Sequence, residues 1–141
     1  MQTKSSPSLA AHLRVAIART ARRLRQEAGG GLSPTVQAAM GTIERHGPLT
    51  PSELASRERI QRPTATRLLA TMEAEGLIIR TPDPEDGRSS LIFLSDEGLA
   101  VLREVRSRKD LFLAERLRKL PAEDRATLDR AATLLEELLA E

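Results

Sequence analysis

The string Thr50-Pro51-Ser52-Glu53 limits the possible folds more than any other part of this sequence. A threonine three residues before a glutamate forms a helix capping box, because each of the two side chains can satisfy a free backbone amide of the other residue. Proline suits the first helical position, where its missing N–H would have had no partner. The string therefore predicts a helix that starts at residue 51. It is short, and Leu54 and Ala55 form its apolar face.

Two more helices flank this one. The earlier helix is capped by Ser33 and stops before Gly47. After a turn over residues 58–61, where Ile60 is expected to enter the core, the later helix runs from about residue 63 to residue 75. It has an apolar face made of Ala65, Leu68, Leu69 and Met72. At 100° per residue, Arg67 lies on the opposite face.

A hairpin follows these helices. Residues 77–81 and 91–95 are apolar runs with alternation and β-branched side chains, and the turn-rich residues 82–90 separate them. Short helices joined by a turn, then a third helix and a hairpin, predict a winged helix-turn-helix over residues 32–95.

Both ends of the chain carry further helical patterns. Apolar residues recur at helical spacing over residues 9–28, with Ser8 as the expected cap, and the glycines at 29–31 end this helix. Ser95 caps a long helix, and Pro121 begins a last one. The fold class is therefore mostly α with a small β-hairpin. Residues 9–31 and 96–141 form a helical module, and residues 1–8 form a flexible tail.

The amino-acid composition limits the kinds of core and of binding partner that this chain can have. The chain has two Phe and no Trp or Tyr, so its core is aliphatic. A net charge of +2 is too small for binding nucleic acid by bulk charge, so the distribution of charge matters more. Arginines crowd the first half of the chain, whereas acids dominate the last helix, so the two ends are expected to face different partners. The acids are Glu123, Asp124, Asp129, Glu136, Glu137 and Glu141.

Several classes are not expected. The chain has no Cys, hence no disulfide or thiolate site, and neither a signal-peptide core nor a run of transmembrane length. We expect a soluble, cytoplasmic protein with no membrane partner. No catalytic residues or cofactor are predicted, because phosphate-cradling glycine loops and nucleophile elbows are missing. His12 and His46 are far apart in the sequence without soft ligands, so no metal site is predicted.

The string Asp83-Pro84-Glu85-Asp86-Gly87-Arg88 resembles the wing signature of the MarR family of bacterial transcription regulators. Arg62-Pro63-Thr64-Ala65-Thr66-Arg67-Leu68 is similar to the start of that family's recognition helix, and residues 72–80 match the approach to the wing. The resemblance covers residues 9–139. It implies a homodimer whose terminal helices interlock, a pseudo-palindromic double-stranded DNA operator, a ligand-responsive repressor and a nucleoid-associated location.

The resemblance also implies a small, often aromatic, anionic effector between the dimer helices and the DNA-binding module. Only Phe93 or Phe112 could supply an aromatic wall for it. The absence of Cys excludes the branch of the family that senses thiol oxidation.

The N-terminal residues of a recognition helix face base edges in the major groove. The predicted contacts are Arg62, Pro63, Thr64, Thr66 and Arg67. Arg67 is the strongest candidate, because a guanidinium can contact guanine O6 and N7 together. In the wing, Arg88 is predicted to enter the minor groove, with Ser89 beside it.

Other assignments stay open. Asp83 and Asp86 are either turn formers or carboxylates that hold Arg88 or Arg80. Candidate phosphate contacts are Ser33, Thr35, Gln37, Thr50 and Ser52, although capping alone explains Ser33 and Thr50. The arginines of the first helix are expected to form a solvated face.

The main rival function is a winged-helix module that binds proteins and not DNA. Arginines on both the recognition face and the wing tip, Arg67 and Arg88, favour DNA. A purely structural helical dimer would leave the hairpin unexplained.

Overall fold

The computed structural model describes residues 3–29 and 31–140. Two compact units make up the chain. We call residues 29–106 the winged unit, and residues 1–28 together with 107–141 the helical unit. Helix α5 (Asp96–Arg118) begins in the winged unit and continues into the helical unit. The described part of the chain forms six helices and a two-stranded antiparallel hairpin, so the predicted fold class is confirmed.

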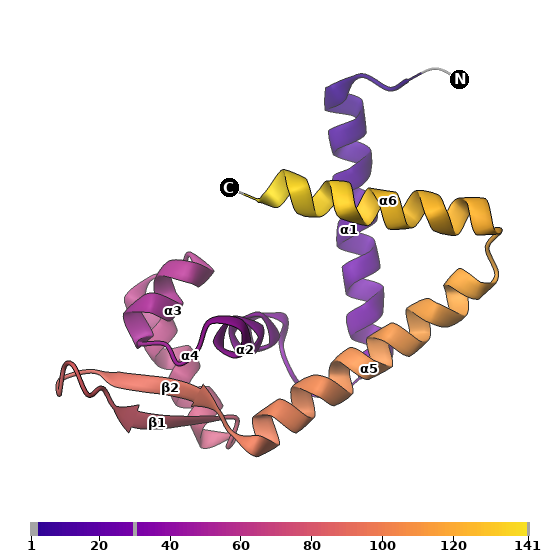
Figure 1. Ribbon diagram of the computed structural model, residues 1–141. Coiled ribbons are helices and arrows are strands. Elements are labelled where there is room, and N and C mark those ends of the chain that lie inside the picture. The colour runs from indigo at the N-terminus through magenta and orange to yellow at the C-terminus, as the bar shows by residue number, and fades with distance from the viewer. Residues whose placement is uncertain (1–2, 30, 141) are drawn as a thin grey trace. The chain divides into compact units, whose positions relative to one another are not determined.

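The winged unit contains α2 (Pro34–His46), α3 (Pro51–Glu58), α4 (Arg62–Ala74), β1 (Ile78–Pro82) and β2 (Ser90–Leu94). Its three helices gather beside the hairpin (Figure 1). The hairpin register pairs Ile78 with Leu94 and Pro82 with Ser90. Leu49, between α2 and α3, adds a bridge to Ile92 of β2, with reciprocal backbone hydrogen bonds of 3.3 and 2.7 Å. The helix-turn-helix and its wing therefore share a continuous backbone network.

Local capping bonds explain where the helices of this unit begin. The hydroxyls of Ser33, Thr50 and Ser95 each accept from the backbone amide three residues ahead, at 3.2, 3.2 and 2.9 Å. The return bond of the Thr50 box differs from expectation, because the Glu53 carboxylate accepts from the Thr50 hydroxyl at 3.2 Å. Helix α4 has no such cap, since the Gln61 side chain makes no capping hydrogen bond.

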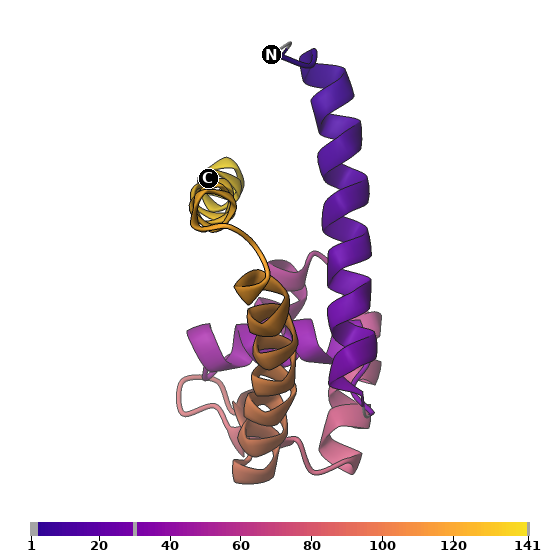
Figure 2. The same cartoon turned by 90° about the vertical axis from the view of Figure 1, so that its right-hand side faces the viewer.

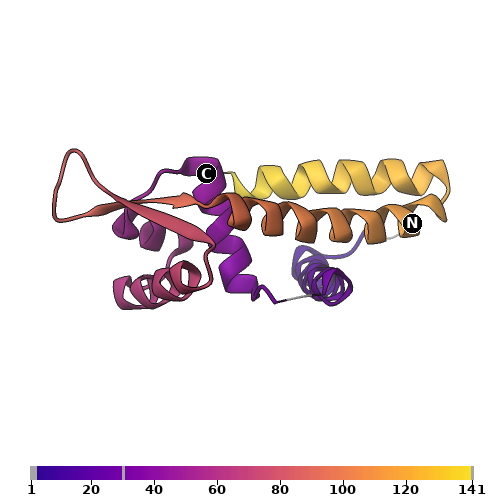
Figure 3. The same ribbon diagram turned by 90° about the horizontal axis from the view of Figure 1, so that it is seen from below.

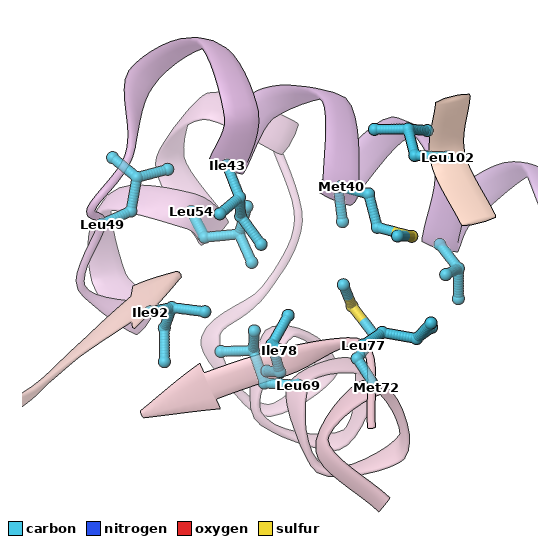
Figure 4. Packing of buried hydrophobic residues seen from close by; sticks show 12 residues of the cluster. Met40, Ile43, Leu49, Leu54, Leu69, Met72, Leu77, Ile78, Ile92 and Leu102 are labelled. Carbon is cyan, nitrogen blue, oxygen red and sulfur yellow. The ribbon is translucent and has the colours of Figure 1, made fainter. Parts of the chain in front are cut away.

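The core of the winged unit is dense and aliphatic, as Figure 4 shows. Its largest fully buried side chains come from α2, the connection between α2 and α3, α3, α4 and β2: Met40, Leu49, Leu54, Leu69, Met72 and Ile92. Gly98 lies where α5 crosses the backbone of Leu77, and a Cβ at Gly98 would fall 2.1 Å from the Leu77 carbonyl oxygen. Ile60, expected in the core, is only half-buried.

Several predicted boundaries were wrong by a few residues. Helix α1 (Ser6–Ala28) starts before residue 9, so Ser8 lies inside it and is not its cap. Pro7 permits the earlier start because the first helical turn needs no amide donors, and the Leu9 amide already donates to the Ser5 carbonyl at 2.9 Å. The expected tail is therefore helical from Ser6, and its first two residues, like Gly30 and Glu141, lie outside the described part.

The helical unit buries little of its apolar surface. Its members are α1, the second half of α5 and α6 (Ala122–Leu139). Ala28 is the one described residue of α1 that is buried, and α6 has none. Figure 2 shows α1 as one uninterrupted helix. The large exposed apolar side chains of this unit are Leu9, Val15, Ile17, Leu111, Leu113, Leu128, Leu134, Leu138 and Leu139. None of the described helices combines the length and apolarity needed to cross a bilayer.

Candidate nucleic-acid interface

The first turns of α4 present the predicted base-reading residues to solvent. Ala65, Leu69 and Met72 are buried and anchor the helix to the core. On the other side, the predicted contacts are exposed, except for half-buried Thr64; they are Arg62, Pro63, Thr64, Thr66 and Arg67. The helix therefore has one face committed to packing and one that a macromolecule can reach.

Hydrogen bonds within α4 orient these polar side chains. Arg67 Nη2 donates to Thr64 Oγ1 at 3.4 Å, which draws the guanidinium toward the N-terminal end of the helix. The Thr66 hydroxyl donates to the Arg62 carbonyl at 3.0 Å, and the Thr71 hydroxyl donates to the Arg67 carbonyl at 3.1 Å. Since the Thr66 proton is engaged in the helix, its methyl group and oxygen lone pair are what remain for a partner.

Arg62 connects the starts of two helices. Its Nη1 donates to the hydroxyl of Ser52 in the first turn of α3. This bond brings a predicted base-reading residue together with a predicted phosphate-contact residue. Both side chains are exposed, so a positive charge lies where the N-terminal turns of α3 and α4 meet.

The wing loop is shaped by its two aspartates. Asp83 Oδ1 accepts from the Glu85 amide at 2.9 Å, and Asp86 Oδ1 accepts from the Arg88 amide at 3.0 Å. Of the two explanations left open for these aspartates, the structure shows turn formation. Ser89 contributes through its backbone, accepting from the Asp83 amide at 3.1 Å and donating to the Asp86 carbonyl at 3.0 Å. The loop extends away from the helices of its unit, with Arg88 exposed in it (Figure 3).

Arg80 is held by a residue that the sequence analysis missed. Its Nε pairs with Glu73 Oε2 on α4 at 2.7 Å, and not with an aspartate of the loop. The pair ties the base of the wing to the recognition helix. Glu73 had only its exposed position on α4 as a signal, because its partner is brought close by packing of the hairpin.

The candidate phosphate contacts fall into different settings. The Ser33 and Thr50 hydroxyls cap α2 and α3, and Gln37 Nε2 donates to the Leu32 carbonyl at 3.0 Å. Thr35 and Ser52 are exposed in the first turns of these helices. These two are the better placed of the set for a phosphate, because the amide ends of the helices favour anions.

The turn between α3 and α4 contains a further basic residue. Arg59 ends α3 with left-handed backbone angles of φ 54° and ψ 45°, and its amide donates to the Ser56 carbonyl at 3.2 Å. Its side chain is exposed, two residues before α4. Within the described residues, no group of His, Asp and Glu side chains is arranged to hold a metal ion.

Comparison with known proteins gives concordant matches. The family model described as "MarR family" matches residues 32–90. An uncharacterized HTH-type transcriptional regulator of Mycobacterium leprae is 36% identical over 138 residues, which cover 97% of this chain and 96% of that protein.

Solved structures agree with these matches. A protein of Pseudomonas aeruginosa, named as a transcriptional regulator, superposes with a TM-score of 0.86 at 35% identity, over 99% of this chain and 100% of that one. A mutant of Staphylococcus aureus MepR, bound to an oligodeoxyribonucleotide, gives a TM-score of 0.70 at 20% identity, over 94% and 98% of the two chains.

Proposed function

Because this chain belongs to the MarR family of DNA-binding transcription regulators, which are not enzymes, we propose that it binds a pseudo-palindromic operator as a sequence-specific homodimer. One observation gives this proposal its strongest support. Arg67 and the other polar residues of the first turns of α4 face solvent, opposite the buried stripe of Ala65, Leu69 and Met72.

The proposed docking places the N-terminal turns of α4 in a major groove. Arg67 contacts a guanine there, and the Thr66 methyl packs on a thymine methyl. Arg62, with Ser52, lies close enough to the helix ends to contact backbone phosphates. In the wing, Arg88 reaches the adjacent minor groove, whose negative potential attracts a guanidinium. Two copies read half-sites about 34 Å apart.

The homodimer part of the proposal rests on the helical unit. Helix α6 has no described buried residue, and Leu138 and Leu139 are 75% and 83% exposed. Leaving this many large apolar side chains in water is unfavourable, and a second copy can cover them symmetrically. Dimerisation also places two recognition helices on one face, as a pseudo-palindrome requires.

We further propose repression that a small anionic effector relieves. A dimer seated on two successive major grooves would block access to a promoter. An effector that favours another spacing of the two recognition helices would weaken binding, because both half-sites could no longer be engaged together. This function places the protein in the cytoplasm, at the nucleoid.

The decisive experiment is selection of bound sequences from a random duplex pool, followed by titration of the best duplex at several salt concentrations. We expect an inverted repeat. Arg67→Ala should lose about 1–3 kcal/mol of binding and relax the preference at one base pair in each half-site, because a bidentate contact is lost. Arg22→Ala, an exposed arginine of α1, is the matched control and should bind like the wild type.

The outcomes separate the rival functions. If no motif is enriched, or if Arg67→Ala and Arg88→Ala both bind like the wild type, the chain is not a DNA reader of this kind. A winged-helix module that binds proteins would then be the better explanation. A loss that is equal on all sequences would instead assign Arg67 to a phosphate.

A further inference from the structure

The wing loop contains the dipeptide Asp86-Gly87, and both of its residues are exposed. Of the six aspartates in the chain, Asp86 alone is followed by glycine, and the chain has no Asn. An aspartate carboxyl group can react with the backbone nitrogen of the next residue. Glycine hinders this attack least, because it has no Cβ. Asp86 is therefore the aspartate whose following residue most favours the reaction.

The other aspartates lie where the same reaction is disfavoured. Asp83 precedes Pro84, whose nitrogen has no hydrogen to lose. The remaining four lie in α5 and α6, where the helical backbone angles hold the side chain away from the next amide nitrogen. They are Asp96, Asp110, Asp124 and Asp129. Both the local sequence and the backbone thus single out Asp86.

Hydrogen bonds of the wing loop hold the Asp86 carboxyl group against the Gly87 peptide. Asp86 Oδ1 accepts from the Arg88 amide at 3.0 Å, and the Asp86 carbonyl accepts from the Ser89 amide at 3.0 Å. This Asx turn folds the side chain back along the backbone. Among the described residues, no acceptor receives the Gly87 amide hydrogen. A Cβ built on Gly87 would meet nothing within 4 Å, so its surroundings are open.

We propose that Asp86 is a site of spontaneous isoaspartate formation. The Gly87 nitrogen bonds to Cγ of the protonated Asp86 carboxyl group, and the amide hydrogen leaves with the carboxyl hydroxyl as water. The product is a cyclic succinimide. Solvent water then breaks one of its two bonds between a carbonyl carbon and the nitrogen. Cleavage at Cγ restores aspartate, whereas cleavage at the original main-chain carbonyl leaves a backbone that runs through Cβ and Cγ.

The isomer changes the geometry of the wing and keeps its charge. The main chain gains a methylene group at residue 86, and the original main-chain carbonyl becomes a free carboxylate. The hydrogen bonds to the Arg88 and Ser89 amides therefore lose their geometry. Arg88 is the proposed minor-groove contact, so this effect rests on the proposed function. We expect the isoaspartate form to bind the operator as weakly as Arg88→Ala does.

Peptide mapping tests the reaction directly. The full-length protein is kept at near-neutral pH and physiological temperature in water enriched in the heavy oxygen isotope. Digestion with trypsin in ordinary water then releases residues 81–88. Fragmentation of this peptide by electron transfer distinguishes isoaspartate from aspartate. We expect isoaspartate and heavy oxygen to accumulate at Asp86, while the peptides that contain Asp96 and Asp110 stay unlabelled.

Two variants block the reaction at different atoms. Gly87→Ala places a methyl group beside the attacking nitrogen without a clash, so labelling at Asp86 should slow several-fold. Asp86→Glu keeps the negative charge but would have to close a larger ring, so residue 86 should stay unlabelled. Circular dichroism at 222 nm reports whether each variant is folded. Labelling in Gly87→Ala at the wild-type rate would contradict the assigned chemistry.

Binding to the selected duplex separates this inference from the proposed function. Incubated wild-type protein should lose affinity by the same factor as fresh Arg88→Ala, and incubation should change the affinity of Gly87→Ala little. Absence of isoaspartate at Asp86, or equal labelling at the other aspartates, would overturn the inference and leave the proposed function standing. Isoaspartate without a loss of affinity would overturn its effect on the wing. Fresh protein that binds no duplex would overturn the proposed function, while the labelling would still decide the chemistry.

Discussion

The winged unit and the helical unit differ in how far they bury their apolar side chains. In the winged unit, Leu54 and Leu69 are completely buried, and hydroxyl caps begin α2, α3 and α5. In the helical unit, α6 has no described buried residue. The winged unit buries its apolar core within a single chain, whereas the helical unit leaves many large apolar side chains exposed.

This contrast is what we expect if the winged unit contacts DNA and the helical unit pairs two copies. In the proposed function, α4 needs a fixed platform, because a small displacement of Arg67 would lose the geometry of its proposed contact with a base. The helical unit is proposed instead to pair two copies, and in that role its apolar side chains must remain available for a partner. We therefore expect mutations in the winged unit to change unfolding, and mutations in the helical unit to change association.

The largest expected effect is in the core of the winged unit. Leu54→Ala should lower the free energy of unfolding by about 2–5 kcal/mol, because it leaves a cavity at a side chain with no exposed surface. Urea titration followed by circular dichroism at 222 nm measures it, since the chain has no Trp or Tyr for fluorescence. The dimer Kd under native conditions should not change. A loss below about 1 kcal/mol would mean that this core is not tightly packed.

Gly98 gives the next largest effect. Gly98→Ala should destabilise the chain by about 1–3 kcal/mol, because its Cβ would lie 2.1 Å from the Leu77 carbonyl oxygen and the backbones would have to separate. Gly87→Ala is the control, since a Cβ there meets nothing within 4 Å. Comparable melting temperatures of the two variants would show that α5 and the backbone of Leu77 do not pack as closely as described.

Mutations on the apolar face of the helical unit should change association of the copies more than unfolding of the chain. Leu134→Ala with Leu138→Ala should weaken the dimer at least about tenfold, because buried apolar area is lost at both symmetric contacts. The urea unfolding midpoint should become more dependent on protein concentration, while binding to a single operator half-site should persist. A double variant that dimerises like the wild type would show that these leucines are not part of the interface.

The smallest expected effect is a gain at the start of α4. Gln61→Ser should stabilise the chain by about 0.5–1 kcal/mol, because Gln61 already has the extended backbone of a cap but makes no capping bond. Thermal melts by circular dichroism would show the increase. Thr50→Ala provides the reverse case and should lose about 1 kcal/mol. If Gln61→Ser lowered the melting temperature, the start of α4 would depend on the glutamine in another way.

The sequence analysis succeeded where a short stretch of chain carries its own explanation. It identified the caps of α2, α3 and α5, the hairpin and the outward direction of Arg67. The start of α1 was missed because Pro7 allows a helix to begin without a strong cap. Ile60 was expected to be buried, but in the folded chain it is only half-buried.

The sequence by itself determined which segments become helix, strand and turn, since capping and Asx-turn bonds join atoms only two or three residues apart. The tertiary structure decided which distant residues meet. Arg80 pairs with Glu73 and Arg62 bonds Ser52, where packing of the hairpin and of α3 brings them together. Arg23 of α1 reaches the ring of Phe112 on α5 for the same reason. Periodicity marks an apolar face, but only packing shows whether the chain covers that face itself, because burial depends on every neighbouring element at once.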